Sequence, residues 1–370
     1  MVQQAVEMKT TIDYLSAGLG TWMKLGYLPR EAWKQMGDQD WIGLSSRAES
    51  GLESFYLLCQ ELAVHKSVGL IGTYSVNEIA LRLLRRFSNP AAEKAAEEIR
   101  TGNKNIALCI SEENAGSDIN KLTTQAIAAD NEGYMITGEK MYITNAPIAD
   151  YFLVAARTNE AGEAWKSISL FLVERHQKGI FVSEEKDKAG ARLMPFGEVH
   201  FADCPVAADC LLGRKNRGFE YLAGALDFER TLISIMALSM SEMVFAELTE
   251  HLNRREIFGK RLIEFQRNKF LISDFYSKIS MLKQFVLNLI NDLKQNQADK
   301  NHVFVAKIQS TELLRELADA ALQLYGAKGY VSDHWIANLY NDIRWLSIGG
   351  GANEMLKDML GNKVVRNPKI

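Results

Sequence analysis

The stretch LDFERTLISIMALSMSEMVFA, residues 226–246, determines how the C-terminal part of the chain folds. Between Thr231 and Ala246 the only charged residue is Glu242, so a helix here is apolar on nearly all sides and is expected to be buried. The surrounding sequence favours more long helices, because Gly259 is the only glycine between Asp227 and Asn296 and no proline follows Phe219 until Pro368. Residues 214–370 are therefore predicted to form a helical bundle.

Two changes of pattern precede this bundle. From residue 1 to 105, apolar residues recur at helical spacing, as in Phe55, Leu58 and Leu62. Between 106 and 213 the segments become short and β-rich, as in Ile168–Val173. Three domains are predicted: an N-terminal helical domain (1–105), an antiparallel β domain (106–213) and the C-terminal bundle (214–370).

The overall composition limits the possible partners. The 370 residues include 43 Lys and Arg against 46 Asp and Glu, a net charge of -3. Nucleic acid and anionic membranes select a concentrated cationic surface, so neither is expected as a partner. The glycine-rich turns that hold dinucleotides and nucleotide phosphates in other folds are both missing.

Cysteine and histidine spacing gives no sign of a disulfide framework or a metal site. The six histidines lack metal-ligand spacing, so no metal is expected. The N-terminus shows neither a secretory nor a transit peptide, so a cytoplasmic protein without a membrane span is expected. The four cysteines have no CxxC spacing and are predicted to be reduced, buried thiols: Cys59, Cys109, Cys204 and Cys210.

Glu229 is the first candidate for chemistry. Ile233, Met236 and Met240 follow it at helical spacing, which places a carboxylate at the end of an apolar stripe. Desolvation there would raise its pKa toward the range of a proton-abstracting base. From the residues alone, the alternative is a first-turn glutamate that the helix dipole favours and that pairs with Arg230.

Three weaker signals accompany Glu229. Ala115–Asp118 is a small-residue turn that could present N–H groups to a ligand, although such turns are common without one. Tyr142 and Thr144 fall on one face of a strand and could contact a flat cofactor or simply lie on a barrel exterior. The glycines at 349–351 allow either close approach to a ligand or a plain turn.

In this order, these segments resemble the acyl-CoA dehydrogenase family of flavoproteins from about Pro29 to Val365. The implied fold is α+β multidomain, with an N-terminal helical domain, a central antiparallel β-barrel-like domain and a C-terminal four-helix bundle. The segments that carry the resemblance are SEENAGSD (111–118), GEKMYITN (138–145), REIFGK (255–260) with Phe265-Gln266, and QLYGAKGY (323–330).

The resemblance implies a noncovalent FAD between the β domain and the bundle. Arg255, Phe258 and Gln266 would come from a neighbouring subunit, so the cofactor would bridge two chains of a homo-oligomer, a dimer of dimers (homotetramer). The implied FAD-contacting residues are Leu108, Ser111, Gly116, Ser117, Tyr142, Thr144, Arg255, Phe258, Gln266, Gln323, Gly326 and Glu354; Ser117, Asp227 and Arg230 would contact the substrate.

The implied reaction is α,β-dehydrogenation of an acyl thioester in fatty acid metabolism. A carboxylate removes the α-proton, the β-hydrogen leaves as hydride to flavin N5, and an electron-transfer flavoprotein takes the electrons. Many members carry the carboxylate in a Tyr-Glu-Gly-Thr segment, but this chain has Gly349-Gly350-Gly351-Ala352 there. The isovaleryl and long-chain branches place it in a segment like Leu226–Arg230, so Glu229 becomes the expected base, and the Gly350 N–H would bind the thioester carbonyl.

Departures from the family pattern near the expected substrate wall keep other activities open. Met194 stands where many relatives have a small hydroxyl residue, which suggests an acyl group on a carrier protein in place of CoA. The alternatives are an FAD oxidase or monooxygenase and a redox-silent paralogue that acts as a binding protein.

Overall fold

The computed structural model describes residues 2–47, 50–129, 133–159 and 163–366, and they form two compact units. The first unit comprises Met1–Ser46, Gly72–Lys188 and Arg192–Phe228; the second comprises Arg47–Ile71, Ala189–Ala191 and Glu229–Ile370. Helices α4 (Val68–Leu84) and α6 (Gly218–Arg254) each contribute residues to both units. The division into three domains at residues 105 and 213 stays a prediction.

Helices occupy most of the chain before residue 105, as the apolar spacing predicted. Helix α3 (Gly51–Ala63), which contains Phe55, Leu58 and Leu62, belongs to the second unit, and the first unit holds the other helices. They are α1 (Val2–Leu25), α2 (Arg30–Asp38) and α5 (Pro90–Arg100), together with most of α4. The start of α5 follows from its sequence: the Asn89 side chain accepts from the N–H groups of Ala91 and Ala92 at 2.9 and 3.1 Å, and Pro90 needs no such partner.

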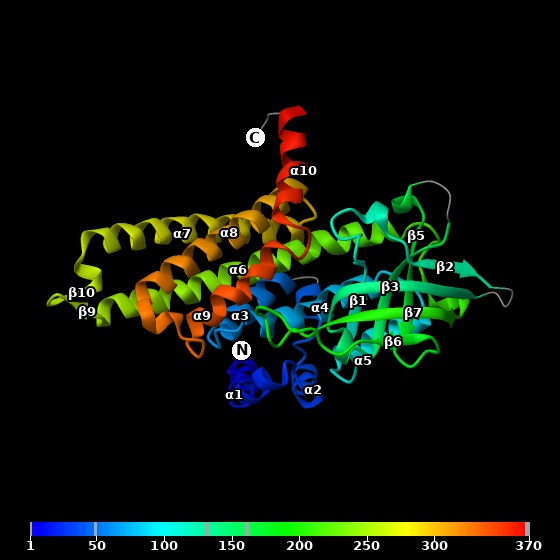
Figure 1. The fold of residues 1–370 in the computed structure, drawn as a ribbon, viewed down its shortest axis with the longest axis horizontal. Coiled ribbons are helices and arrows are strands. Elements are labelled where there is room, and N and C mark those ends of the chain that lie inside the picture. The colour runs from blue at the N-terminus through cyan, green and yellow to red at the C-terminus, as the bar shows by residue number, and fades with distance from the viewer. Residues whose placement is uncertain (1, 48–49, 130–132, 160–162, 367–370) are drawn as a thin grey trace. The chain divides into compact units, whose positions relative to one another are not determined.

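One eight-stranded sheet forms the rest of this unit (Figure 1). The order β6-β7-β3-β2-β4-β5-β8 contains antiparallel pairs, but β1 pairs with β4 in parallel. Strand β2 also pairs with β4 in parallel, at Gln125 and Arg157. The prediction of an antiparallel domain is therefore wrong for the pairs that β4 makes with β1 and β2, because the chain between these strands is long enough for a parallel return. The bounds are β1 Ile106–Cys109, β2 Gln125–Ala128, β3 Tyr134–Thr144, β4 Tyr151–Arg157, β5 Ile168–Glu174, β6 Ile180–Val182, β7 Phe196–Val206 and β8 Leu211–Leu212.

Strand β3 is irregular at Tyr142. The register with β7 shifts between Lys140 and Ile143, and Tyr142 has a left-handed φ of 58°. This bulge breaks the alternation that was expected to set Tyr142 and Thr144 on one face, and Tyr142 is 55% exposed. A bulge aims this one aromatic side chain independently of its neighbours.

A buried ion pair fixes the loop after β1 to this strand. Lys140 is fully buried, and its Nζ donates to Glu112 Oε1 at 2.8 Å and to the Ile110 carbonyl at 3.1 Å. Glu112 also accepts from the backbone N–H and hydroxyl groups of Thr123 and Thr124. Burial by itself would raise the pKa of Glu112, but Lys140 and these hydrogen bonds lower it to about 2. The carboxylate therefore stays ionised.

The second unit is a helical bundle, which confirms the predicted C-terminal bundle. Figure 1 shows α6, α7 and α8 running alongside one another, with α10 crosswise to them. Glu242 on α6 accepts from Lys283 Nζ on α7 and from the Tyr56 hydroxyl on α3, both at 2.8 Å. The elements are α3 Gly51–Ala63, α6 from Glu229, β9 Glu256–Ile257, β10 Lys260–Arg261, α7 Gln266–Lys294, α8 Lys300–Tyr325, α9 Trp335–Asp342 and α10 Asn353–Arg366.

Helix α6 starts earlier than the sequence suggested. It begins at Gly218, so Glu229 lies about three turns inside the helix and the alternative of a first-turn glutamate is wrong. Residues 218–228 contain no proline, and the helix continues through Gly224. Among the described residues, α6 alone is long and apolar enough to cross a membrane, but 72% of its most apolar window is buried inside the protein. Packing in the core accounts for this apolar character.

The cysteines are free thiols. Three are buried as predicted, and Cys210 is half-buried because it lies in the short turn before β8. Burial raises the pKa of the Cys204 thiol to about 11. Burial also raises the pKa of the Cys109 and Cys210 thiols, so none of these three is poised as a thiolate near neutral pH.

Replacing Glu112 by Gln should lower the free energy of unfolding by about 3–5 kcal/mol, because it leaves the buried Lys140 charge without its partner. The stability that Glu112 supplies is complete above its ordinary pKa of 4.5 and is lost as pH falls toward 2, so the deficit of the variant should shrink in acid. Urea unfolding of both proteins across this pH range measures it. Asp38→Asn is the control, because it breaks an exposed Lys34–Asp38 pair expected to contribute less than about 1 kcal/mol. Equal effects of the two substitutions would contradict the role of Glu112.

Candidate active site

Glu229 lies on α6 at the head of the predicted apolar stripe. Ile233, Met236 and Met240 are buried on the same side of the helix, whereas Glu229 itself keeps intermediate exposure. Burial of the carboxyl group raises the pKa of Glu229, and the positive charges of Arg230 and Lys307 act in the opposite direction. The group is thus desolvated without being sealed from a ligand.

The triglycine turn brings Gly350 against Glu229. Gly350 and Gly351 have left-handed φ values of 64° and 90°. A Cβ at position 350 would lie 2.9 Å from Ile233 Cδ1 and 3.6 Å from Glu229 Cδ. The missing side chain at 350 therefore lets the backbone approach the carboxylate, so the two predicted catalytic residues are neighbours.

Two buried cations hold this turn from beneath. Arg230 Nε donates to the Gly350 carbonyl at 2.8 Å, and Lys307 Nζ on α8 donates to the Gly351 carbonyl at 3.0 Å. Lys307 Nζ also donates to Asn353 Oδ1 at 2.7 Å. The expected contact of Arg230 with substrate stays a prediction, because this guanidinium already binds the turn.

Lys307 was not predicted from the sequence. The available signal was a lone lysine within an apolar helical segment that includes Val303, Phe304, Ala306 and Ile308. Desolvation lowers the pKa of Lys307 to about 8, although Glu229 pulls it upward. Lys307 lies far from the glycines in sequence, so the sequence did not indicate that it contacts the turn.

The first unit holds one group of the predicted cofactor residues. Ser111, Gly116 and Ser117 lie in the loop after β1, and the N–H of Met141, next to Tyr142, donates to the Ser111 carbonyl at 3.0 Å. A Cβ at Gly116 would meet nothing within 4 Å, so the backbone there is open to a ligand. Leu108 on β1, Thr144 on β3 and Asp227 on α6 belong to the same unit and are half-buried.

A second group lies at the far end of the bundle. Arg255 follows the end of α6, and Phe258, with a φ of 50°, forms the tip of the β9–β10 hairpin with 93% of its surface exposed. His251, one turn before Arg255, stacks on Tyr325 with ring centroids 4.0 Å apart. This contact brings the Gln323–Gly326 segment at the end of α8 to the same end of the bundle.

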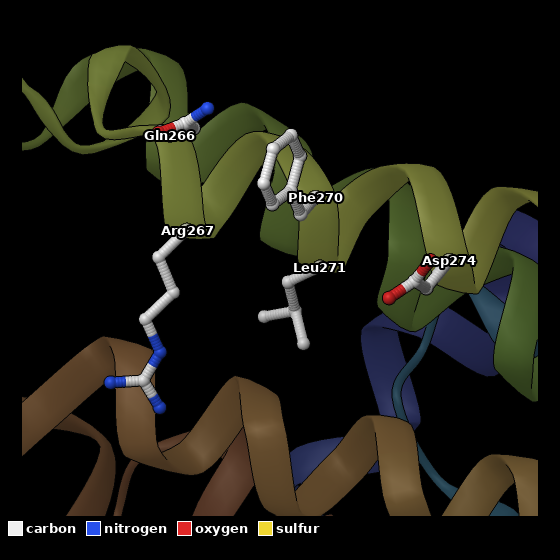
Figure 2. Close-up of a pocket in the computed structure, with 5 residues that line it drawn as sticks. All are labelled: Gln266, Arg267, Phe270, Leu271 and Asp274. Atoms are coloured by element: carbon white, nitrogen blue, oxygen red, sulfur yellow. The ribbon is translucent and has the colours of Figure 1, made fainter.

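Gln266 begins α7 beside this group and lines an open pocket of about 440 Å³ (Figure 2). The other lining residues are Arg267, Phe270, Leu271 and Asp274. Figure 2 shows the Arg267 and Leu271 side chains extending from α7 toward the next helix. The pocket offers both an apolar surface and a cationic group.

Glu354 lies apart from the second group. It is in the first turn of α10, next to Asn353, and its charge acts on Lys307. From Glu229 to the end of α6 at Arg254 the helix rises about 37 Å. The predicted cofactor residues of the bundle therefore fall into two separate sets, one beside Glu229 and one at the far end.

Each unit, taken by itself, offers groups that suit part of a flat, phosphorylated cofactor such as FAD. Gly116 and Gly326 expose backbone with open space around them, and Tyr142 and Phe258 present aromatic faces. Arg255 adds a cation for a phosphate. Among the described residues, no cluster of three or more His, Cys, Asp or Glu could hold a metal ion.

Comparisons with known proteins identify one family. Residues 107–204 match the model of the acyl-CoA dehydrogenase middle domain, and residues 216–365 match that of the acyl-CoA dehydrogenase C-terminal domain. The mouse (Mus musculus) mitochondrial long-chain specific acyl-CoA dehydrogenase is 30% identical over 93% of this chain and 81% of its own length. Isovaleryl-CoA dehydrogenase from Pongo abelii is 29% identical over 90% and 80%.

A solved structure extends the likeness to the whole fold. The acyl-CoA dehydrogenase from Geobacillus kaustophilus superposes with a TM-score of 0.92 at 28% identity and covers 98% of both chains. Members of this family are FAD flavoproteins. The chain therefore belongs to the acyl-CoA dehydrogenase family and is an FAD-dependent oxidoreductase that acts on acyl-CoA.

Proposed function

We propose that the protein catalyses α,β-dehydrogenation of an acyl thioester with Glu229 as the base. The observation that carries the proposal is the position of the Glu229 carboxyl group against the backbone of Gly350, at the end of an apolar stripe. A thioester α-proton is weakly acidic, so its removal needs both a desolvated carboxylate and a donor to the carbonyl oxygen. Here the carboxylate of Glu229 and the backbone N–H of Gly350 belong to residues that are in contact.

Each residue has a separate task in this reaction. Glu229 in its ionised form takes the α-proton, and the Gly350 N–H donates to the thioester carbonyl as negative charge develops on the oxygen. The electrons of the broken Cα–H bond form the double bond, and the β-hydrogen leaves with its electron pair. FAD, when bound, supplies the acceptor for that hydride at N5.

The triglycine turn supports Glu229 over a base on the turn itself. The segment 349–352 carries no carboxylate, and any side chain at 350 would meet Ile233. Two of the relatives are by name long-chain and isovaleryl dehydrogenases, the branches whose base placement the Leu226–Arg230 segment resembles. The base is thus provided by α6, opposite the turn.

A homo-oligomer in which two chains share each FAD is the second part of the proposal. The set of residues around Arg255 and Phe258 is separated from Glu229 by about 37 Å of helix, too far to belong to one compact reaction centre. Phe258 is 93% exposed at the tip of its hairpin, so its ring is available to a neighbouring chain. A dimer of dimers in which this set meets the FAD of a neighbouring chain satisfies both observations.

Acyl-CoA is the substrate class of the family, and the proposed alternative is an acyl group carried as a thioester on a carrier protein. Met194 is buried at the expected pantetheine wall, where a thioether offers no hydroxyl for the arm. Turnover of one acyl chain on CoA and on a carrier protein decides between them. Electron-transfer flavoprotein is the proposed electron acceptor, and rapid reoxidation by air would favour an oxidase instead.

Glu229→Gln should retain FAD but lower the rate of anaerobic flavin bleaching by acyl-CoA about a hundred-fold to ten-thousand-fold, because the base is removed. In the unchanged protein the rate should fall with decreasing pH at a higher pH than for an ordinary glutamate, since burial raises the pKa of Glu229 and only the ionised form accepts a proton. Stopped-flow absorbance across pH measures both. The control is Glu220→Gln in the exposed first turn of the same helix, and unchanged bleaching by Glu229→Gln removes it from the mechanism.

Phe258→Asp should reduce both the assembly size and the FAD content, because it places a charge in the proposed contact with a neighbouring chain. Light scattering gives the mass, and the ratio of flavin to protein absorbance gives the occupancy. Phe181→Asp changes another exposed phenylalanine, on β6, and should alter neither quantity. A fully loaded oligomer of normal size from Phe258→Asp would contradict the shared site.

A further inference from the structure

We propose that Lys307 is a positioning residue for this reaction, and that its positive charge, beyond its hydrogen bonds, sets the Gly350–Gly351 turn and the ionisation of the carboxylate opposite it. The inference rests on the proposed role of Glu229. It concerns a residue on α8 that has no direct contact with the reacting atoms in that mechanism.

The contacts of Lys307 join the turn to α8 and α10. Its Nζ donates to the Gly351 carbonyl and to Asn353 Oδ1, and Asn353 Nδ2 donates in turn to Thr311 Oγ1 at 3.0 Å. Arg230 holds the preceding carbonyl, that of Gly350. The two successive carbonyls of the turn are thus bound by side chains from two different helices. These contacts restrict rotation about the glycine backbone bonds and so fix the direction of the Gly350 N–H.

Holding the turn with a buried lysine costs folding stability. Lys307 is 0% exposed, and among the described residues no carboxylate lies within 4.0 Å of its Nζ. Both of its acceptors are neutral amide oxygens, which a neutral donor could also satisfy. Burying an ammonium without a close counter-ion costs stability, so the charge itself calls for an explanation.

The charged groups around Lys307 supply that explanation. Glu229 and Arg230 act on it from α6, and Glu354 acts from α10. Lys307 in turn lowers the pKa of Glu229, against the larger effect of burial. A desolvated base beside a fixed ammonium remains ionised at a pH where an isolated buried carboxyl would be protonated.

The test compares Lys307→Met and Lys307→Gln holoenzymes with the unchanged protein and with Lys357→Met. Lys357 on α10 pairs with Glu312 on α8, so the control breaks an exposed ion pair between the same two helices. The Lys307→Met variant should reduce flavin with acyl-CoA about tenfold to a hundred-fold more slowly. Its Kd for the thioester should change much less, and the acidic limb of its rate profile should shift to higher pH.

A second measurement needs no turnover. The pKa of Lys307 is about 8 in the fold and 10.5 ordinarily, so between these values the unfolded chain binds more protons at this site. The stability of the unchanged protein relative to Lys307→Met should therefore rise with pH from about 8 to about 10.5. Melting temperatures of the two proteins over this range give the difference, which Lys357→Met should not show.

The outcomes separate this inference from the proposed function. If Glu229→Gln stops flavin bleaching while Lys307→Met keeps the normal rate and pH profile, the role of Lys307 is wrong and the base assignment stands. If Glu229→Gln bleaches normally, the base assignment fails first. Lys307→Gln retains a hydrogen-bond donor without the charge, so a normal acidic limb of the rate profile in this variant also overturns the proposal. If Lys307→Met does not fold, Lys307→Gln by itself decides the test.

Discussion

The site depends on two buried cations that bind successive carbonyl groups of a glycine turn. Arg230 holds the carbonyl of Gly350, and Lys307 holds that of Gly351. Three glycines in a row would otherwise be among the most flexible segments in the chain, because each lacks the side chain that restricts its backbone. The cations convert this flexibility into a fixed close approach to Glu229, and a side chain at 350 would prevent it.

The sequence predicted the parts of the structure that depend on local pattern. The apolar run 231–246 correctly indicated a buried helix, and the spacing of Glu229 from Ile233 and Met240 correctly placed it on an apolar stripe. The predictions failed for features that depend on contacts between residues far apart in the sequence. Neither the parallel pairing of β1 with β4 nor the bulge at Tyr142 has a signal in periodicity, because both depend on which strands become neighbours.

Lys307 shows the same limit within the site. A resemblance between motifs transfers the residues that the motifs contain, and Lys307 lies outside each of the segments that carried the resemblance here. Its importance follows only from a contact between α8 and the turn before α10. The position of Glu229 about three turns inside α6 was similarly hidden, since residues 218–225 carry no strong helix-start signal. A carboxylate can reach one point in space from different elements, so chain position alone does not identify a base.

The Glu112–Lys140 pair constrains how the loop of the first unit can diverge. Each partner alone is costly to lose, because the other would remain as an isolated charge in the interior. Replacing both together by apolar residues of similar volume removes that penalty. Evolution of this loop should therefore proceed by paired exchange, and lineages that keep one of the two residues should keep the other.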